Sequence, residues 1–286
     1  MQVIRAGTLG FCFGVRDALS AAFLLDEPKS VTIHGELVHN RAVQDRLRER
    51  GFRQTAEAER DALPSTDQVL VTAHGISNRE RERLAAAGKQ LIDTTCPLVA
   101  YLHARALSAQ SEGFHVILIG KRGHVEVNGV LGDLESATLV QSVEDVSPLP
   151  HDKLAICAQT TTPASVAEAI LARVRELHPR AEVRYHDTIC APTKQRIQAV
   201  SKLAGEVDLM VIVGGRNSNN TLQLVETARA RGTRVRHVES AEELQPHWFL
   251  GRERIGLAAG TSTPDELLAR VEARLAEIGA LLGARV

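Results

Sequence analysis

The sequence predicts an α/β fold made of three similar domains. Short apolar runs alternate with helix-compatible segments along the 286 residues, which is typical of parallel sheets joined by crossover helices. In addition, a cysteine stands at a predicted strand-to-helix junction three times, at Cys12, Cys96 and Cys190. We therefore expect α/β domains over residues 14–96, 97–193 and 194–286 with 1–13, related by rough three-fold symmetry around a shared centre.

The composition narrows the classes of function. With 34 Lys and Arg against 35 Asp and Glu, the formal net charge of -1 excludes a bulk attraction to nucleic acid or anionic lipid. No apolar run approaches the roughly 20 residues of a membrane helix, and the first residues lack the pattern of a signal peptide. The four cysteines do not resemble a secreted disulfide framework. We expect a cytoplasmic protein with no nucleic-acid or membrane partner.

The first third of the chain alternates strand and helix after the Cys12 junction. Its further elements are predicted as strands at 31–34 and 68–72 and as helices at 41–50 and up to Gly88. His39 and His74 each stand in a loop after one of these strands. In a parallel sheet such loops gather functional groups at one edge.

The second third repeats this scheme. Its elements are predicted as helices at 98–110 and 164–177 and as strands at 115–119, 138–140 and 153–158. His124 and Glu126 follow the strand at 115–119, and Thr160 follows that at 153–158. In an extended segment Glu126 would share a side with His124. Glu126 is the candidate proton donor, provided that burial raises its pKa.

The last third has strands at 209–213, near 235 and at 255–259, and a final helix that starts near Asp265. Ser218, Asn219 and Asn220 follow the first of these strands, and Ser262 follows the last. Loops rich in Gly, Ser, Thr and Asn at helix starts offer donors for a phosphate or diphosphate. These loops therefore predict a small anionic ligand.

The junction cysteines are candidate metal ligands. Nearly the same residues lead to two of them, Asp93-Thr94-Thr95-Cys96 and Asp187-Thr188-Ile189-Cys190, and a cysteine at a helix start is favoured as a thiolate. Their spacing lacks the paired C-x-x-C of structural zinc. If the three thiolates converge, they suggest a 4Fe-4S cluster with one iron open to a reactant. Cys157, inside an apolar strand, is expected to be a core residue.

Simpler interpretations exist for each residue alone. A cysteine at a helix start is usually a packed thiol, the serines and asparagines could be caps or turn residues, and Glu126 could be a surface carboxylate. Solvated or core-satisfied roles are expected for His34, His103, His115, His151, His178, His186, His237 and His247. Two rival functions remain open: a zinc-stabilised binding protein without redox chemistry, and an iron-sulfur dehydratase or reductase of another small diphosphate.

The assembled motifs resemble the 4-hydroxy-3-methylbut-2-enyl diphosphate reductase family over essentially the whole chain. The resemblance lies in nine segments in order: Gly10-Phe11-Cys12-Phe13-Gly14-Val15, Val38-His39-Asn40, Ala73-His74-Gly75, Asp93-Thr94-Thr95-Cys96-Pro97, Gly123-His124-Val125-Glu126, Gln159-Thr160-Thr161, Asp187-Thr188-Ile189-Cys190, Asn217-Ser218-Asn219-Asn220 and Gly260-Thr261-Ser262.

This resemblance implies three α/β domains in a trefoil, one 4Fe-4S cluster on Cys12, Cys96 and Cys190, and reductive removal of the substrate's allylic hydroxyl. The products would be isopentenyl and dimethylallyl diphosphate, with electrons from a ferredoxin or flavodoxin. Residues implied to hold the diphosphate are His39, His74, His124, Ser218, Asn219, Asn220 and Ser262. Thr160 would organise the hydroxyl, Glu126 would relay the proton, and His124 would be a catalytic residue as well as a diphosphate ligand. The sequence departs from the family's usual residues at Val125, Asn128, Pro192 and Asn219.

Overall fold

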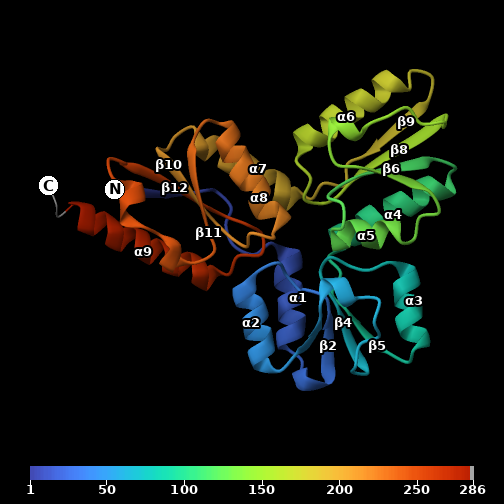
Figure 1. The fold of residues 1–286 in the computed structure, drawn as a ribbon, viewed down its shortest axis with the longest axis horizontal. Helices are drawn as coiled ribbons and strands as arrows, with labels where there is room; N and C mark the ends of the chain where they lie inside the picture. The colour runs from blue at the N-terminus through green and yellow to red at the C-terminus, as the bar shows by residue number, and fades with distance from the viewer. Residues whose placement is uncertain (284–286) are drawn as a thin grey trace. The chain divides into compact units, whose positions relative to one another are not determined.

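The structure, a computed structural model, describes residues 1–283, apart from the side chain of Ala58. Within that range the chain forms three four-stranded parallel sheets with helices between the strands (Figure 1). It divides into two compact units. Among the described residues, the first unit comprises Met1–Phe13, His39–Val43 and residues 191–283, and the second comprises Gly14–Val38 and Gln44–Cys190. The predicted α/β class is confirmed.

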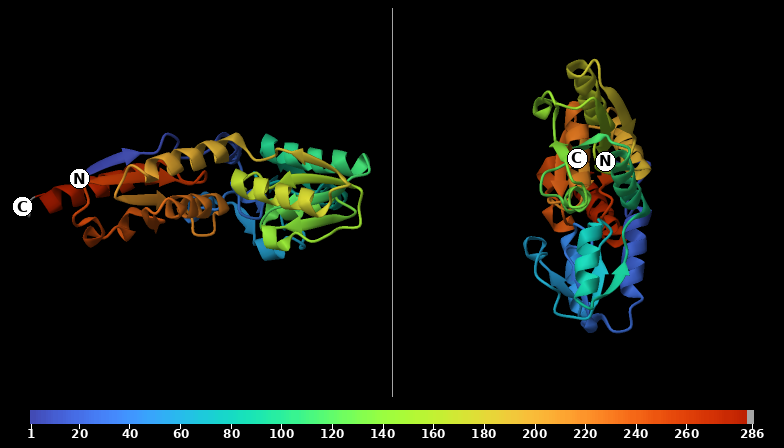
Figure 2. Two further views of the ribbon diagram at one scale, coloured as in Figure 1. Left: turned by 90° about the horizontal axis from the view of Figure 1, so that it is seen from above. Right: turned by 90° about the vertical axis from the view of Figure 1, so that its right-hand side faces the viewer.

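The first unit holds one sheet, of strand order β1-β12-β10-β11. Its elements are β1 (Gln2–Arg5), α7 (Ala191–Ala204), β10 (Leu209–Val213), α8 (Asn219–Ala230), β11 (Arg234–Val238), β12 (Arg254–Ala259) and α9 (Asp265–Gly283). Successive residues of a strand point to opposite faces. Val211 therefore joins the core under α9, whereas Met210 and Ile212 join the core under α7 and α8. Strand β1 begins at the end of this unit where α9 ends (Figure 2).

The second unit holds the other two sheets, of which one has the order β3-β2-β4-β5. The elements around this sheet are α1 (Phe13–Phe23), β2 (Val31–His34), α2 (Arg41–Arg50), β3 (Arg53–Thr55), β4 (Gln68–Val71), α3 (Asn78–Ala86) and β5 (Gln90–Asp93). The first residue of α1 and the first three of α2 belong to the first unit. Val69 and Val71 pack with Leu84 of α3 on one face. Figure 1 shows α1 and α2 on the side of the sheet away from α3.

The third sheet has the order β7-β6-β8-β9. Its elements are α4 (Pro97–Ser111), β6 (His115–Ile119), α5 (Val125–Leu131), β7 (Ala137–Val140), β8 (Lys153–Ala158), α6 (Ala164–Leu177) and β9 (Glu182–His186). Leu118 packs with α4 and α5 on one face, and Ile117 packs with α6 on the other. Helices on both faces explain why β6 and β8 are almost wholly apolar.

The three sheets draw their strands from residues 2–5 with 209–259, 31–93 and 115–186. Each set lies within one of the three predicted ranges, and the division into three domains at those boundaries stays a prediction. Among residues 1–283, no helix combines the length and the apolar character that crossing a bilayer requires.

One local prediction was wrong. The segment around Glu126 is not extended, because Val125–Leu131 forms helix α5. The alternation Val125-Glu126-Val127 and the helix-weakening Gly129 favour a strand. The helix nevertheless forms, since it buries Val127 and Val130 against the core beneath it. Tertiary packing thus overrides the local propensity.

Candidate active site

The three junction cysteines occupy equivalent places at the ends of the sheets. Each follows a strand and directly precedes a helix, as predicted. In each sheet the cysteine N–H donates to the carbonyl of the second residue after the neighbouring strand: Cys96 to Ala73, Cys190 to Thr160 and Cys12 to Thr261, at 3.0, 3.0 and 3.1 Å. The same hydrogen bond therefore sets the backbone at all three positions.

The chemistry of these side chains fits metal ligation. All three thiols are half-buried, and the cysteines form no disulfide among the described residues. Cys96 caps α4, with Pro97 at the first helical position, and the positive end of a helix favours a thiolate. Within the second unit, a Cβ atom added at Gly14 would lie 2.5 Å from the Cys96 sulfur. Only glycine leaves room for that sulfur.

Cys157 is different from the other three. It lies on β8 with no exposed surface, in the core under α4 and α5. Burial raises the pKa of its thiol to about 12, so the thiolate that metals require does not form. The prediction of a core role is confirmed.

Glu126 has the environment of a proton donor. It lies in the first turn of α5 and is 2% exposed. Its Oε1 accepts from the Thr160 N–H at 2.7 Å, and its Oε2 accepts from the Thr160 hydroxyl at 3.0 Å. Burial raises the Glu126 pKa to about 7, against the two hydrogen bonds, which lower it. Near neutral pH the carboxyl group can therefore hold a proton or release it.

Thr160 links this acid to a junction cysteine. Its N–H and hydroxyl hold the Glu126 carboxylate, while its carbonyl accepts from the N–H of Cys190. Thr160 stands directly beyond β8, which fixes its backbone in the sheet. One loop residue thus positions both groups.

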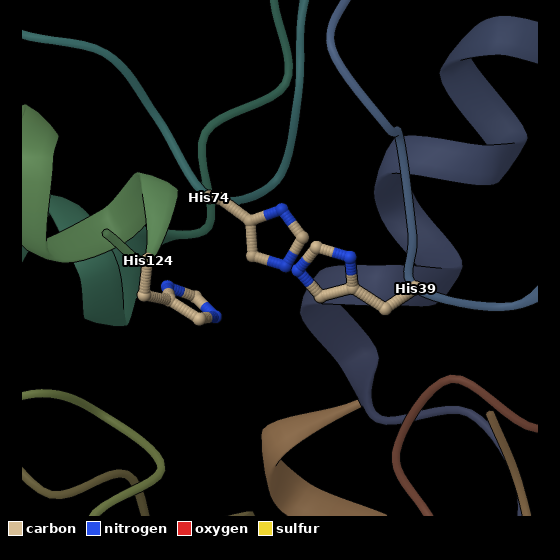
Figure 3. Close-up of side chains that lie close together, drawn as sticks. All are labelled: His39, His74 and His124. Carbon is tan, nitrogen blue, oxygen red and sulfur yellow. The ribbon is translucent and has the colours of Figure 1, made fainter. Parts of the chain in front are cut away.

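Two of the predicted histidines lie side by side in the second unit. His124 caps α5, and its Nδ1 accepts from the Glu126 N–H at 3.2 Å. In neutral His124 the proton must then be on Nε2, which makes Nε2 a donor. The rings of His74 and His124 meet edge to face with centroids 5.6 Å apart (Figure 3). Both imidazoles can donate hydrogen bonds to an anion bound near Glu126.

The remaining predicted ligand residues gather in the first unit. Ser218, Asn220 and Ser262 are all at most 5% exposed and follow the ends of β10 and β12. The Ser262 hydroxyl donates to the His39 carbonyl at 3.3 Å. A Cβ atom added at Gly215 would lie 2.6 Å from that carbonyl oxygen. Glycine there lets the His39 segment pack against the ends of these strands.

Asn220 of the first unit has a buried side-chain amide without polar partners in the described part of the chain. Neither polar atom of its buried side-chain amide has a hydrogen-bond partner among the described residues. Its neighbours Ser218 and Asn219 cap and begin α8. A buried amide without partners costs free energy unless a ligand supplies them. The residue is therefore well suited to bind a polar ligand.

Sequence reasoning missed Arg196. This residue of α7 is 4% exposed, and its guanidinium donates to the Gly10 carbonyl at 2.7 Å, two residues before Cys12. The signal was available: Arg196 falls in helical phase with Thr193 and Val200, both buried. A charged residue on the core face of a helix calls for a specific partner.

The fold and these residues define the class of protein. The protein is an α/β protein of three parallel sheets that presents a half-buried thiol at one strand end of each sheet, together with a buried acid and polar loops that can bind an anion. The model of the family described as LytB protein matches residues 3–276. The chain belongs to the LytB family.

Two relatives are similar over nearly their whole length. The chain is 36% identical to the 4-hydroxy-3-methylbut-2-enyl diphosphate reductase of Aquifex aeolicus over 285 residues, which cover 97% of each chain. It is 38% identical to the enzyme of the same name from Anaeromyxobacter sp. over 268 residues, or 93% of each chain.

Two solved structures have similar folds. The E-1-hydroxy-2-methyl-but-2-enyl-4-diphosphate reductase of Plasmodium falciparum matches with a TM-score of 0.87 at 26% identity, covering 95% of this chain and 86% of that one. A second structure, of (E)-4-hydroxy-3-methyl-but-2-enyl diphosphate reductase, matches with a TM-score of 0.69 at 36% identity, covering 96% and 99%.

Proposed function

We propose that the protein is a 4-hydroxy-3-methylbut-2-enyl diphosphate reductase, the terminal enzyme of the non-mevalonate route to isoprenoids. The main support is the junction cysteine of each sheet, held by the same backbone hydrogen bond, in a chain whose full-length relatives bear that name. The reaction adds two electrons and two protons to the allylic alcohol. It releases water and leaves isopentenyl or dimethylallyl diphosphate.

Enzymes of the LytB family are iron-sulfur proteins. For this chain we propose one 4Fe-4S cluster with Cys12, Cys96 and Cys190 as its ligands and one iron without a protein ligand. When bound, such a cluster supplies electrons and a Lewis acid to the carbon–oxygen bond that breaks. The half-buried thiols and the space left at Gly14 support this assignment.

The protein's own residues would bind the diphosphate and move the proton. His39, His74, His124, Ser218, Asn219, Asn220 and Ser262 are the proposed donors to the diphosphate oxygens. These side chains add no standing negative charge, so they suit a polyanion. Glu126 is the proposed acid. It gives its proton to the Thr160 hydroxyl, which passes its own proton to the substrate and keeps the substrate's hydroxyl in place.

The supply of electrons is part of the proposal. We propose a ferredoxin or flavodoxin as donor and the cytoplasm as the location, since both the cluster and its thiolates need a reducing compartment.

Anaerobic purification tests this function. The protein is expected to be brown, to contain iron and acid-labile sulfide, and to convert the allylic diphosphate to the two products only when a reductant is present. A colourless, zinc-containing protein would instead indicate the non-redox binding protein. Turnover without reductant would indicate a dehydratase.

Replacing Asn220 with leucine is expected to raise KM for the diphosphate by about 10- to 100-fold, with a smaller effect on kcat, because one or two hydrogen bonds to a charged group are lost. The ligand-free variant is expected to be more stable by about 1 kcal/mol, since its buried amide has no partners. Steady-state kinetics and urea unfolding measure the two effects. Gln223→Leu, on the same helix, is the control, and an unchanged KM in the Asn220 variant would exclude Asn220 from binding.

A further inference from the structure

A cavity of about 290 Å³ lies against Glu126 in the second unit. Its walls come from α3, α4, α5 and the loop after β4, and they include the exposed residues Asn78 and Ala104 as well as the buried Glu126. The cavity therefore extends from the protein surface to Glu126. It is large enough for several water molecules, and the polar residues on its largely apolar walls, among them His74, Arg81 and His103, can bind them.

His103 is the titratable side chain that α4 contributes to this cavity. Its Nε2 lies 2.7 Å from Asp133 Oδ2, and the side chains are 13% and 5% exposed. Asp133 also accepts the N–H groups of Asn78 and Arg79, at 2.6 and 3.0 Å. Two N–H groups of α3 thus fix the carboxylate, and its close contact with Nε2 favours one orientation of the imidazole.

The other charged group on these walls is already paired. Arg81 donates to the Asp93 carboxylate at 2.8 Å and to the Thr95 hydroxyl at 3.0 Å. An arginine keeps its proton at all working pH values. Among the described lining residues, the ionisable side chains other than Arg81 are those of His74, His103 and Glu126.

The proposed reaction makes a return path necessary. Each turnover takes a proton from Glu126, whose two oxygens both face Thr160. The carboxylate must be reprotonated before the next turnover. We propose that this cavity is the path by which protons reach Glu126 from solvent, with the His103–Asp133 pair as the outer donor. This inference rests on the proposed function.

The transfer balances without any further reactant. Protonated His103, with Nε2 held by Asp133, loses a proton from its other ring nitrogen to cavity water, and a proton from that water converts the Glu126 carboxylate to the acid. His103 then regains a proton from bulk solvent. The direction is favourable: burial, against Asp133, lowers the pKa of His103 below its usual value, whereas burial raises that of Glu126 to about 7. The proton therefore moves to the stronger base.

Kinetics of a His103 variant distinguish a proton-donating role of this residue from a purely structural one. His103→Gln keeps a hydrogen-bond donor for Asp133 but cannot titrate. It is expected to lower kcat by about 10²-fold, with KM little changed, and imidazole added at millimolar levels should restore much of the loss. His115→Gln, which removes another half-buried imidazole from the same sheet region, should leave kcat unchanged. A normal kcat in His103→Gln, or a loss that imidazole does not reverse, would overturn the proposal.

Reprotonation can also be followed without turnover. Infrared spectra of the anaerobic holoprotein should show a protonated carboxyl band that Glu126→Gln removes. After a drop in pH, the intensity of this band is expected to rise more slowly in His103→Gln than in the wild type. The same slower recovery is expected in Ala104→Leu, which fills the cavity and leaves the His103–Asp133 pair intact. Unchanged recovery in both variants would refute the path. This readout needs no substrate, so it stays valid if the wild type does not reduce the allylic diphosphate and the proposed function fails.

Discussion

Replacing Glu126 with glutamine is expected to lower turnover of the allylic diphosphate by about 10²- to 10⁴-fold, the usual contribution of a general acid, while the substrate still binds. Glutamine keeps the shape of the side chain and can accept from the Thr160 N–H, but it has no proton to give. Steady-state kinetics with a chemical reductant, together with calorimetric binding, separates the two effects.

The same carboxyl group predicts two pH dependences. In the wild type, kcat/KM should fall as the pH rises through about 7, the pKa of Glu126, because the acid is then lost. The pKa of Glu126 in the folded protein exceeds its ordinary value of 4.5. The contribution of Glu126 to the stability of the fold is therefore fully present below about pH 4.5 and is lost as the pH rises through about 7. At pH 8.5 Glu126→Gln should therefore be more stable than the wild type, by up to about 3 kcal/mol.

Glu135→Gln is the matched control, because Glu135 is an exposed carboxylate shortly after α5. It should change neither turnover nor its pH profile. Full activity in Glu126→Gln would exclude Glu126 as the acid.

Replacing Cys96 with serine is expected to remove most of the iron, the labile sulfide and the brown colour, and to abolish turnover. A hydroxyl is a poorer ligand for iron than a thiolate. Metal and sulfide analysis of anaerobic preparations measures the loss. The far-ultraviolet circular dichroism spectrum should be retained, because Cys96 anchors α4 through its backbone N–H and carbonyl.

Two further variants sharpen this test. Cys157→Ala removes a thiol that is buried in the core and should keep the iron and sulfide of the wild type. Gly14→Ala keeps all four thiols but puts a methyl group 2.5 Å from the Cys96 sulfur, and should weaken metal retention about 10- to 100-fold. A Cys96→Ser protein with its full iron content would show that Cys96 is not a ligand.

Much of the architecture follows from local sequence patterns. The apolar runs at β6, β8 and β10 mark buried strands because helices cover both faces of each sheet. The junction cysteines were placed correctly, since strand end, cysteine and helix start are contiguous in the sequence. Strand β3 was missed because its residues, Arg53, Gln54 and Thr55, carry no apolar signal, as is common at a sheet edge.

The parts of the site that depend on distant contacts could not be predicted. The sequence alone suggested Glu126 as a proton donor, but not that Thr160, 34 residues away, would hold both of its oxygens. His103 was expected to have an ordinary solvated or core role. Only the meeting of α3, α4 and α5 shows that it shares a cavity with Glu126.

The position of Thr160 has a mechanical consequence. Its carbonyl braces the backbone of Cys190, and its amide and hydroxyl brace Glu126. A displacement of this loop by a fraction of an ångström would move both Cys190, a proposed cluster ligand, and Glu126, the proposed acid. The proposed supply of electrons and the proposed supply of the proton are therefore coupled through this loop. A change in the loop that alters the position of one group is expected to alter the position of the other.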